Sequence, residues 1–139
     1  MKALDPKLRK ALKKAGVTNA RRHLFLCLGP DCCAPEAGQA TWKYIKQRTK
    51  ELDLPVMRTK ALCFRLCQSG PWLVVYPEGI WYAKVTPQRF ERILQEHLLG
   101  GKPVSKWIAA RNTLGNAEEE VEALSGYAPA SASIMKPDL

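Results

Sequence analysis

All five cysteines of the chain lie in two short segments, and this grouping limits the available folds more than any other feature. Cys27, Cys32 and Cys33 form the first group, and Cys63 and Cys67 form the second. Each group follows an apolar stretch that is typical of a strand. If the thiols form one site, the fold has to bring the ends of two strands together.

The residues between the two groups predict how this happens. Residues 23–28 and 56–62 are predicted as strands, and residues 39–52 have the apolar spacing of a helix. A strand–helix–strand order favours parallel pairing with a right-handed crossover. Parallel strands end at the same edge of a sheet, so we expect Cys27 and Cys63 to lie near each other.

The following residues predict a hairpin and a closing helix. Residues 72–76 and 80–85 flank the turn sequence Pro77-Glu78-Gly79. Thr86-Pro87 is a helix start, and the apolar spacing continues until Gly100-Gly101. The predicted fold is α/β, with a central four-stranded mixed sheet flanked by helices.

We divide the chain into three parts. Residues 1–21 form a basic N-terminal helix or arm, residues 22–104 form the core domain, and residues 105–139 form a C-terminal extension. Within the extension we expect a short helix over residues 116–124 and disorder over residues 128–139.

Composition favours a soluble cytoplasmic protein. No apolar stretch approaches the ~20 residues of a membrane helix, and the N-terminus lacks the apolar core of a secretory signal. In the cytoplasm, clustered cysteines bind metal or do redox chemistry more often than they form disulfides.

The formal net charge of +9 is unevenly distributed. Residues 1–22 contain eight basic residues and one acidic residue, whereas residues 116–139 contain five acidic residues and one basic residue. This asymmetry fits a basic arm that faces an acidic partner, nucleic acid or anionic lipid, and it equally fits a solvated helix.

The thiols themselves favour a metal centre. Thiolates select zinc, Cu(I) or iron–sulfur clusters. Zinc ribbons typically have two residues between paired cysteines, whereas here the gaps are four (or five) and three residues. Wider gaps favour a two-iron cluster. A Cys-x-x-Cys redox pair, a hydrolytic constellation and a phosphate-binding loop are all absent from the sequence.

The chain resembles the thioredoxin-like 2Fe–2S ferredoxins and the small 2Fe–2S subunit of NADH dehydrogenases and related hydrogenases. The resemblance covers roughly residues 22–104. The matching segments are Cys27-Leu28-Gly29-Pro30-Asp31-Cys32, Cys63-Phe64-Arg65-Leu66-Cys67, Gly70-Pro71, and Val74-Val75-Tyr76-Pro77-Glu78-Gly79-Ile80-Trp81-Tyr82.

This resemblance implies a thioredoxin-like fold and a 2Fe–2S cluster ligated by Cys27, Cys32, Cys63 and Cys67. It implies one-electron transfer with a redox enzyme as donor or acceptor, and not catalysis, although the chain could be a subunit of an oxidoreductase. The basic charge suggests an acidic docking surface on that partner, for which Lys10, Lys13 and Lys14 are the candidate contacts. The resemblance also permits a homodimer.

Two assignments stay open. The four-residue gap matches Cys32 to the family's second ligand, but counting back from Trp42 favours Cys33. Arg65, between two ligands, is either a cation that raises the reduction potential or a plain solvent-facing residue. The rival interpretation is a zinc-stabilised module with its basic arm on nucleic acid, although nucleic acid is not the expected partner.

Overall fold

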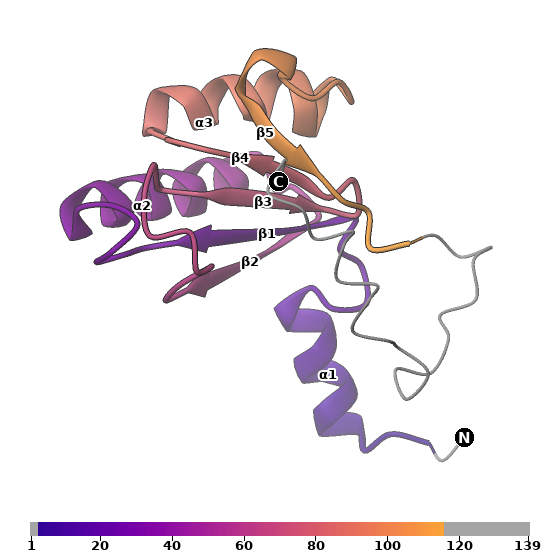
Figure 1. Cartoon of the computed structure of the whole chain (residues 1–139). Coiled ribbons are helices and arrows are strands. Elements are labelled where there is room, and N and C mark those ends of the chain that lie inside the picture. The colour runs from indigo at the N-terminus through magenta and orange to yellow at the C-terminus, as the bar shows by residue number, and fades with distance from the viewer. Residues whose placement is uncertain (1–2, 116–139) are drawn as a thin grey trace, which may run out of the picture.

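The computed structural model describes residues 3–115, and Figure 1 shows their arrangement. In chain order the elements are α1 (Pro6–Ala15), β1 (Arg22–Cys27), α2 (Pro35–Glu51), β2 (Val56–Ala61), β3 (Leu73–Tyr76), β4 (Ile80–Tyr82), α3 (Pro87–Ile93), the π-helical turn η1 (Leu94–Leu99), the 3-10 turn η2 (Ser105–Trp107) and β5 (Ile108–Arg111). The helix predicted over residues 116–124 and the disorder predicted over residues 128–139 lie outside the described residues.

The strands form one mixed sheet in the order β2-β1-β3-β4-β5. The pairing of β1 with β2 is parallel, as predicted, and the other three pairings are antiparallel. The arrowheads of β1 and β2 point to the same edge of the sheet in Figure 1. The α/β prediction is therefore confirmed, together with the common edge for the two strands that precede the cysteine groups.

The predicted strand number was wrong, because the sheet has five strands and not four. The fifth strand, β5, comes from residues assigned to the C-terminal extension. It pairs antiparallel with β4, and it is held at its end by a 2.8 Å hydrogen bond from the backbone N–H of Asn112 to the carbonyl of Gly79. A Cβ at Gly79 would collide with the backbone of Asn112. The end of β5 can therefore approach the β3–β4 turn only because residue 79 is glycine.

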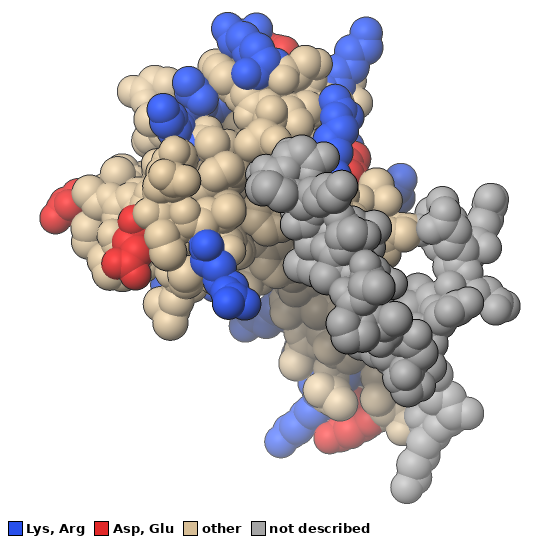
Figure 2. All heavy atoms as spheres, in the orientation of Figure 1, with Lys and Arg blue, Asp and Glu red and all other residues tan. Residues whose placement is uncertain are grey.

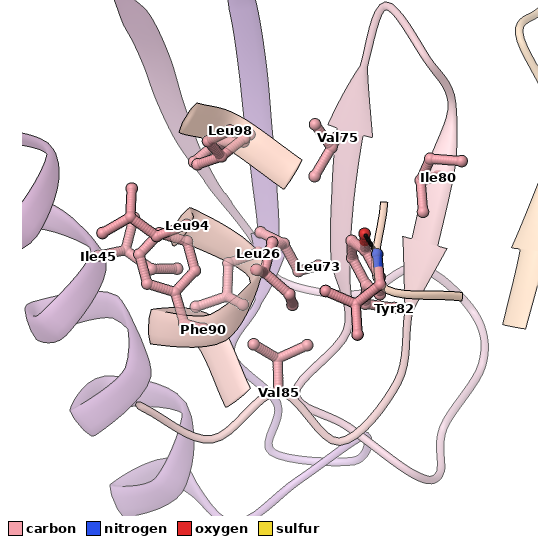
Figure 3. Close-up of a cluster of buried hydrophobic side chains, with 13 residues drawn as sticks. Leu26, Ile45, Leu73, Val75, Ile80, Tyr82, Val85, Phe90, Leu94 and Leu98 are labelled. Carbon is pink, nitrogen blue, oxygen red and sulfur yellow. Dashed lines mark hydrogen bonds between the residues drawn. The ribbon is translucent and has the colours of Figure 1, made fainter. Parts of the chain in front are cut away.

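The core lies between the sheet and the helices α2 and α3 (Figure 3). The side chains that form it are almost fully buried, and they are Leu24, Leu26, Ile45, Leu73, Val75, Ile80, Tyr82, Val85, Phe90, Ile93, Leu94, Leu98 and Val104. Ile45 from α2 and Phe90 from α3 meet the strands from the same side (Figure 3). Burial of this apolar surface fixes α2 and the loop that precedes it against the sheet.

The helix ends follow their sequence signals. Thr86 caps α3 by accepting a 3.1 Å hydrogen bond from the backbone N–H of Arg89. Asp5 caps α1, and Gly16 ends it in the left-handed conformation. No residue of α1 is buried, and the helix projects away from the sheet in Figure 1. Within residues 3–115, no helix combines the length and the apolarity needed to cross a membrane.

A buried polar network ties the start of β1 to the β3–β4 turn. Arg22 Nε donates to Glu78 Oε2 at 2.9 Å, and His97 Nε2 lies 3.0 Å from the same oxygen. The other ring nitrogen, His97 Nδ1, lies 2.9 Å from the hydroxyl of Tyr82. The Glu78 carboxylate can only accept, so the neutral His97 ring carries its proton on Nε2 and its Nδ1 accepts from the Tyr82 hydroxyl. The Tyr82 oxygen also accepts a 3.0 Å hydrogen bond from the N–H of Val104.

This network predicts that stability falls in mild acid. Burial lowers the pKa of His97 below 6.5, outweighing the opposing effect of Glu78. The unfolded chain therefore takes up a proton at a pH where the folded chain does not, and stability is lost as the pH falls below about 6.5. We expect His97→Gln to cost about 1–3 kcal/mol at pH 7.5 and to flatten this pH dependence, as measured by urea unfolding at pH 7.5 and 5.5.

His23→Gln is the matched control, because the His23 ring is only partly buried. It should change the slope of stability against pH less than His97→Gln does. An unchanged slope in His97→Gln would contradict the assignment of the acid sensitivity to the buried ring.

Candidate metal centre

The register of β1 and β2 places the two cysteine groups at one edge of the sheet. Cys27, the last residue of β1, is paired with Ala61, the last residue of β2. The next residue, Leu28, donates its N–H to the carbonyl of Ala61 at 3.1 Å. Cys27 Sγ lies 3.9 Å from the carbonyl oxygen of Leu62, so its sulfur faces the start of the segment that carries the second cysteine group.

The first loop, residues 28–34, buries its thiols wholly or in part. Cys32 is 6% exposed and Cys33 is half-buried, and their sulfurs lie 3.7 Å apart. The loop can turn this tightly because Gly29 has a positive φ of 85° and a Cβ there would collide with the carbonyl of Cys33.

The second loop, residues 62–72, leaves its thiols at the surface. Both Cys63 and Cys67 are exposed, and the backbone N–H of Arg65 lies 3.1 Å from Cys63 Sγ. Arg65, Cys67 and Ser69 all have positive φ angles, of 68°, 44° and 61°, which side-chain-bearing residues adopt infrequently. Such a run of strained residues is typical of a segment whose conformation serves a function.

A glycine joins the two loops. Gly70 donates its N–H to the carbonyl of Cys32 at 2.7 Å. A Cβ at Gly70 would lie 2.7 Å from that carbonyl oxygen and 3.0 Å from the Cβ of Cys32. The second loop can therefore approach the first only because residue 70 has no side chain.

The surroundings of Cys32, Cys33 and Cys67 raise the pKa of these three thiols and so oppose their ionisation. Burial raises the pKa of Cys32 to about 12, and the neighbouring Cys27 and Cys33 add to the effect. The pKa of Cys67 is also raised, first by desolvation and then by Cys63 and Asp31. A thiolate at this edge needs a compensating positive charge, which a metal centre supplies.

The thiols are gathered at one edge but are not closed around a single ion. Within residues 3–115, no three His, Cys, Asp or Glu side chains are close enough to hold one metal ion. The histidines take no part in the site, since His23 contacts Thr59 at 2.7 Å and His97 belongs to the buried network.

A pocket of about 400 Å³ lies beside the second loop, and it was not predicted from the sequence. Phe64 and Leu66, which lie between the two cysteines of that loop, line it together with Trp72 and Trp81. The Phe64 ring packs edge-on against Trp81, with ring centroids 5.4 Å apart. An apolar residue between two cysteines is the only sequence signal for it, and such a residue is as easily explained by packing.

Comparisons with curated proteins find 2Fe–2S ferredoxins. No protein-family model matches the chain. It is 30% identical to a 2Fe–2S ferredoxin of Clostridium pasteurianum over 102 residues, which span 65% of this chain and 97% of the relative. It is 27% identical to a 2Fe–2S ferredoxin of Aquifex aeolicus (strain VF5) over 100 residues, which span 65% of this chain and 90% of the relative.

Solved structures give the same result and confirm the predicted thioredoxin-like fold. A thioredoxin-like [2Fe–2S] ferredoxin from Aquifex aeolicus superposes with a TM-score of 0.60 at 27% identity, covering 67% of this chain and 94% of that chain. The wild-type thioredoxin-like [2Fe–2S] ferredoxin from Aquifex aeolicus, in a crystal structure at 1.5 Å, superposes with a TM-score of 0.58 at 28% identity.

The close contact at Gly70 predicts a specific loss of bound metal. Gly70→Ala should push Cys32 away from the second loop and lower the iron retained per chain severalfold, at a stability cost of about 1–3 kcal/mol from overpacking. Iron analysis after anaerobic purification measures the effect.

Gly101→Asn is the control for this substitution, because its Cβ would enter open space and asparagine tolerates the positive φ of 78°. It should retain full iron. Equal iron in Gly70→Ala and in the parent chain would show that the contact between the loops does not set the position of Cys32.

Proposed function

Because the chain belongs to the thioredoxin-like 2Fe–2S ferredoxin family, we propose that it carries single electrons on a 2Fe–2S cluster ligated by Cys27, Cys32, Cys63 and Cys67. The relatives are named 2Fe–2S ferredoxins, so the cluster is the cofactor of this family and electron transfer is its function. The ligand set is the part of the proposal that is specific to this chain.

The parallel pairing of β1 with β2 is the observation that supports this ligand set best. It puts Cys27 beside the end of β2, and the hydrogen bond between Gly70 and Cys32 holds the second loop against the first. The two cysteine groups are about 30 residues apart in the chain, and no local interaction would bring them to one edge.

The chemistry of the donor set also fits the cluster. All five cysteines are free thiols, and soft thiolates are the ligands of iron–sulfur clusters. When bound, the cluster accepts and releases one electron. The protein contributes the thiolates, the exclusion of water and the hydrogen bonds to sulfur.

The two loops have different tasks in this proposal. The first loop keeps water from Cys27 and Cys32, which are buried. The second loop holds Cys63 and Cys67 at the surface, where a partner can approach. The backbone N–H of Arg65 points at Cys63 Sγ and favours negative charge on that sulfur. The Arg65 side chain is exposed, which agrees with the interpretation of Arg65 as a solvent-facing residue.

The partners in this proposal are redox enzymes that present an acidic surface to this basic chain. The compartment we propose is the cytoplasm, because the five cysteines are free thiols. A homodimer stays a prediction. The rival zinc-stabilised module on nucleic acid finds no support in the comparisons.

The proposed function predicts a coloured protein. Anaerobically purified chain should be brown, with visible absorption that dithionite bleaches and air restores. A colourless protein with stoichiometric zinc would contradict the proposal.

The cysteine doublet gives a second test. We expect Cys32→Ser to lose most of the visible absorption and bound iron, and Cys33→Ser to keep both, since the four-residue gap from Cys27 assigns Cys32 as the ligand. The reverse result would make Cys33 the ligand, and equal losses from both would contradict a single assignment.

A further inference from the structure

Three cations surround one indole ring on the surface beside α3. Around the Trp107 ring centroid, Arg89 Cζ lies at 4.7 Å, Arg92 Cζ at 5.3 Å and Lys106 Nζ at 5.3 Å. We call these four residues the Trp107 patch. Figure 2 shows Lys and Arg gathered over this part of the molecule, which is occupied by α3 and β5 in Figure 1.

The charges of the patch are mostly uncompensated. Among residues 3–115, only Arg92 of the three cations forms an ion pair, with Glu96. The indole offers each cation a modest attraction, but the cations repel one another at this spacing. A bound anion would relieve that repulsion, and the planar guanidinium groups of Arg89 and Arg92 suit a carboxylate.

The patch lies at the same end of the sheet as the cysteines. Arg89 donates to the carbonyl of Ala83 at 3.4 Å, and the adjacent Lys84 donates its N–H to the carbonyl of Ser69 at 2.8 Å. Ser69 follows Cys67 by two residues and precedes Gly70, which binds Cys32. A short run of direct contacts therefore connects the patch to both cysteine loops.

The basic N-terminal helix lies at the opposite end. It precedes Arg22, where β1 begins, and Cys27 is the sixth and last residue of β1. At about 3.3 Å per residue, the five steps from Arg22 to Cys27 give a separation of roughly 17 Å. A partner docked on Lys10, Lys13 and Lys14 would therefore sit far from the thiols. Electron transfer weakens steeply with distance, so this docking position is unfavourable.

We propose that the Trp107 patch binds carboxylates of the electron-transfer partner and so directs an acidic surface to the cysteine end of the molecule. This inference rests on the proposed function. The predicted contact with the partner's acidic surface is then made by Arg89, Arg92 and Lys106, and not by the lysines of α1. The partner class is a redox protein whose docking surface carries clustered Asp and Glu.

The test uses hexaglutamate peptide as the probe and the full chain with its visible absorption recorded in every variant. At about 0.1 M ionic strength the Debye length is about 10 Å, so only nearby charges act on the peptide. We expect the Trp107 indole N–H resonance to shift on titration. Arg89→Gln/Lys106→Gln should weaken binding by about fivefold to tenfold, because each exposed charge pair contributes up to about fivefold.

Lys10→Gln/Lys14→Gln is the matched control, since it removes the same net charge from α1. It should weaken binding less than twofold. An equal or larger loss in this control, or an unmoved Trp107 resonance, would overturn the proposal.

A further variant separates the partner from the chain's own acidic residues. Glu118→Gln/Glu119→Gln/Glu120→Gln should leave hexaglutamate binding unchanged. Binding strengthened about tenfold would mean that this segment occupies the patch, which overturns the assignment to a partner. Absence of visible absorption in all variants would instead reject the proposed function, whatever the peptide does.

Discussion

The register between β1 and β2 is the constraint on which the site depends. Cys27 of β1 is paired with Ala61 of β2, so both strands end at the same edge of the sheet. A cysteine-containing loop follows each of them. A slip of one residue would turn the side chains of β1 to the opposite face and remove Leu24 and Leu26 from the core. The apolar core under α2 and α3 therefore fixes the register, and the register fixes the site.

The helices and strands that depend on local interactions could be predicted from the sequence. Short apolar runs predicted the first four strands, and apolar spacing with the Thr86 cap and the glycine stops predicted the three α-helices. It did not reveal β5, because Ile108-Ala109-Ala110-Arg111 is short and two of its residues are small. These residues form a strand through their pairing with β4 and the space left by Gly79, which are long-range interactions.

The common position of the two cysteine groups was predictable from the sequence, but the burial of each thiol was not. Cysteine spacing and strand order indicated one edge and a metal centre. They could not indicate that Cys32 is buried while Cys63 and Cys67 are exposed, since that depends on how Gly70 packs on Cys32. The distribution of charge along the chain indicated α1 as the partner contact. The Trp107 patch consists of residues that come together only in the fold.

The most direct test of the account is the iron and acid-labile sulfide content of the anaerobically prepared chain and of two variants, Cys27→Ser and Cys63→Ser. One cysteine is taken from each group, so the measurement asks whether both groups serve one centre. One 2Fe–2S cluster held by both groups predicts about two iron and two sulfide ions per chain, and loss of both in either variant. A full complement of iron and sulfide in one of the variants would contradict it.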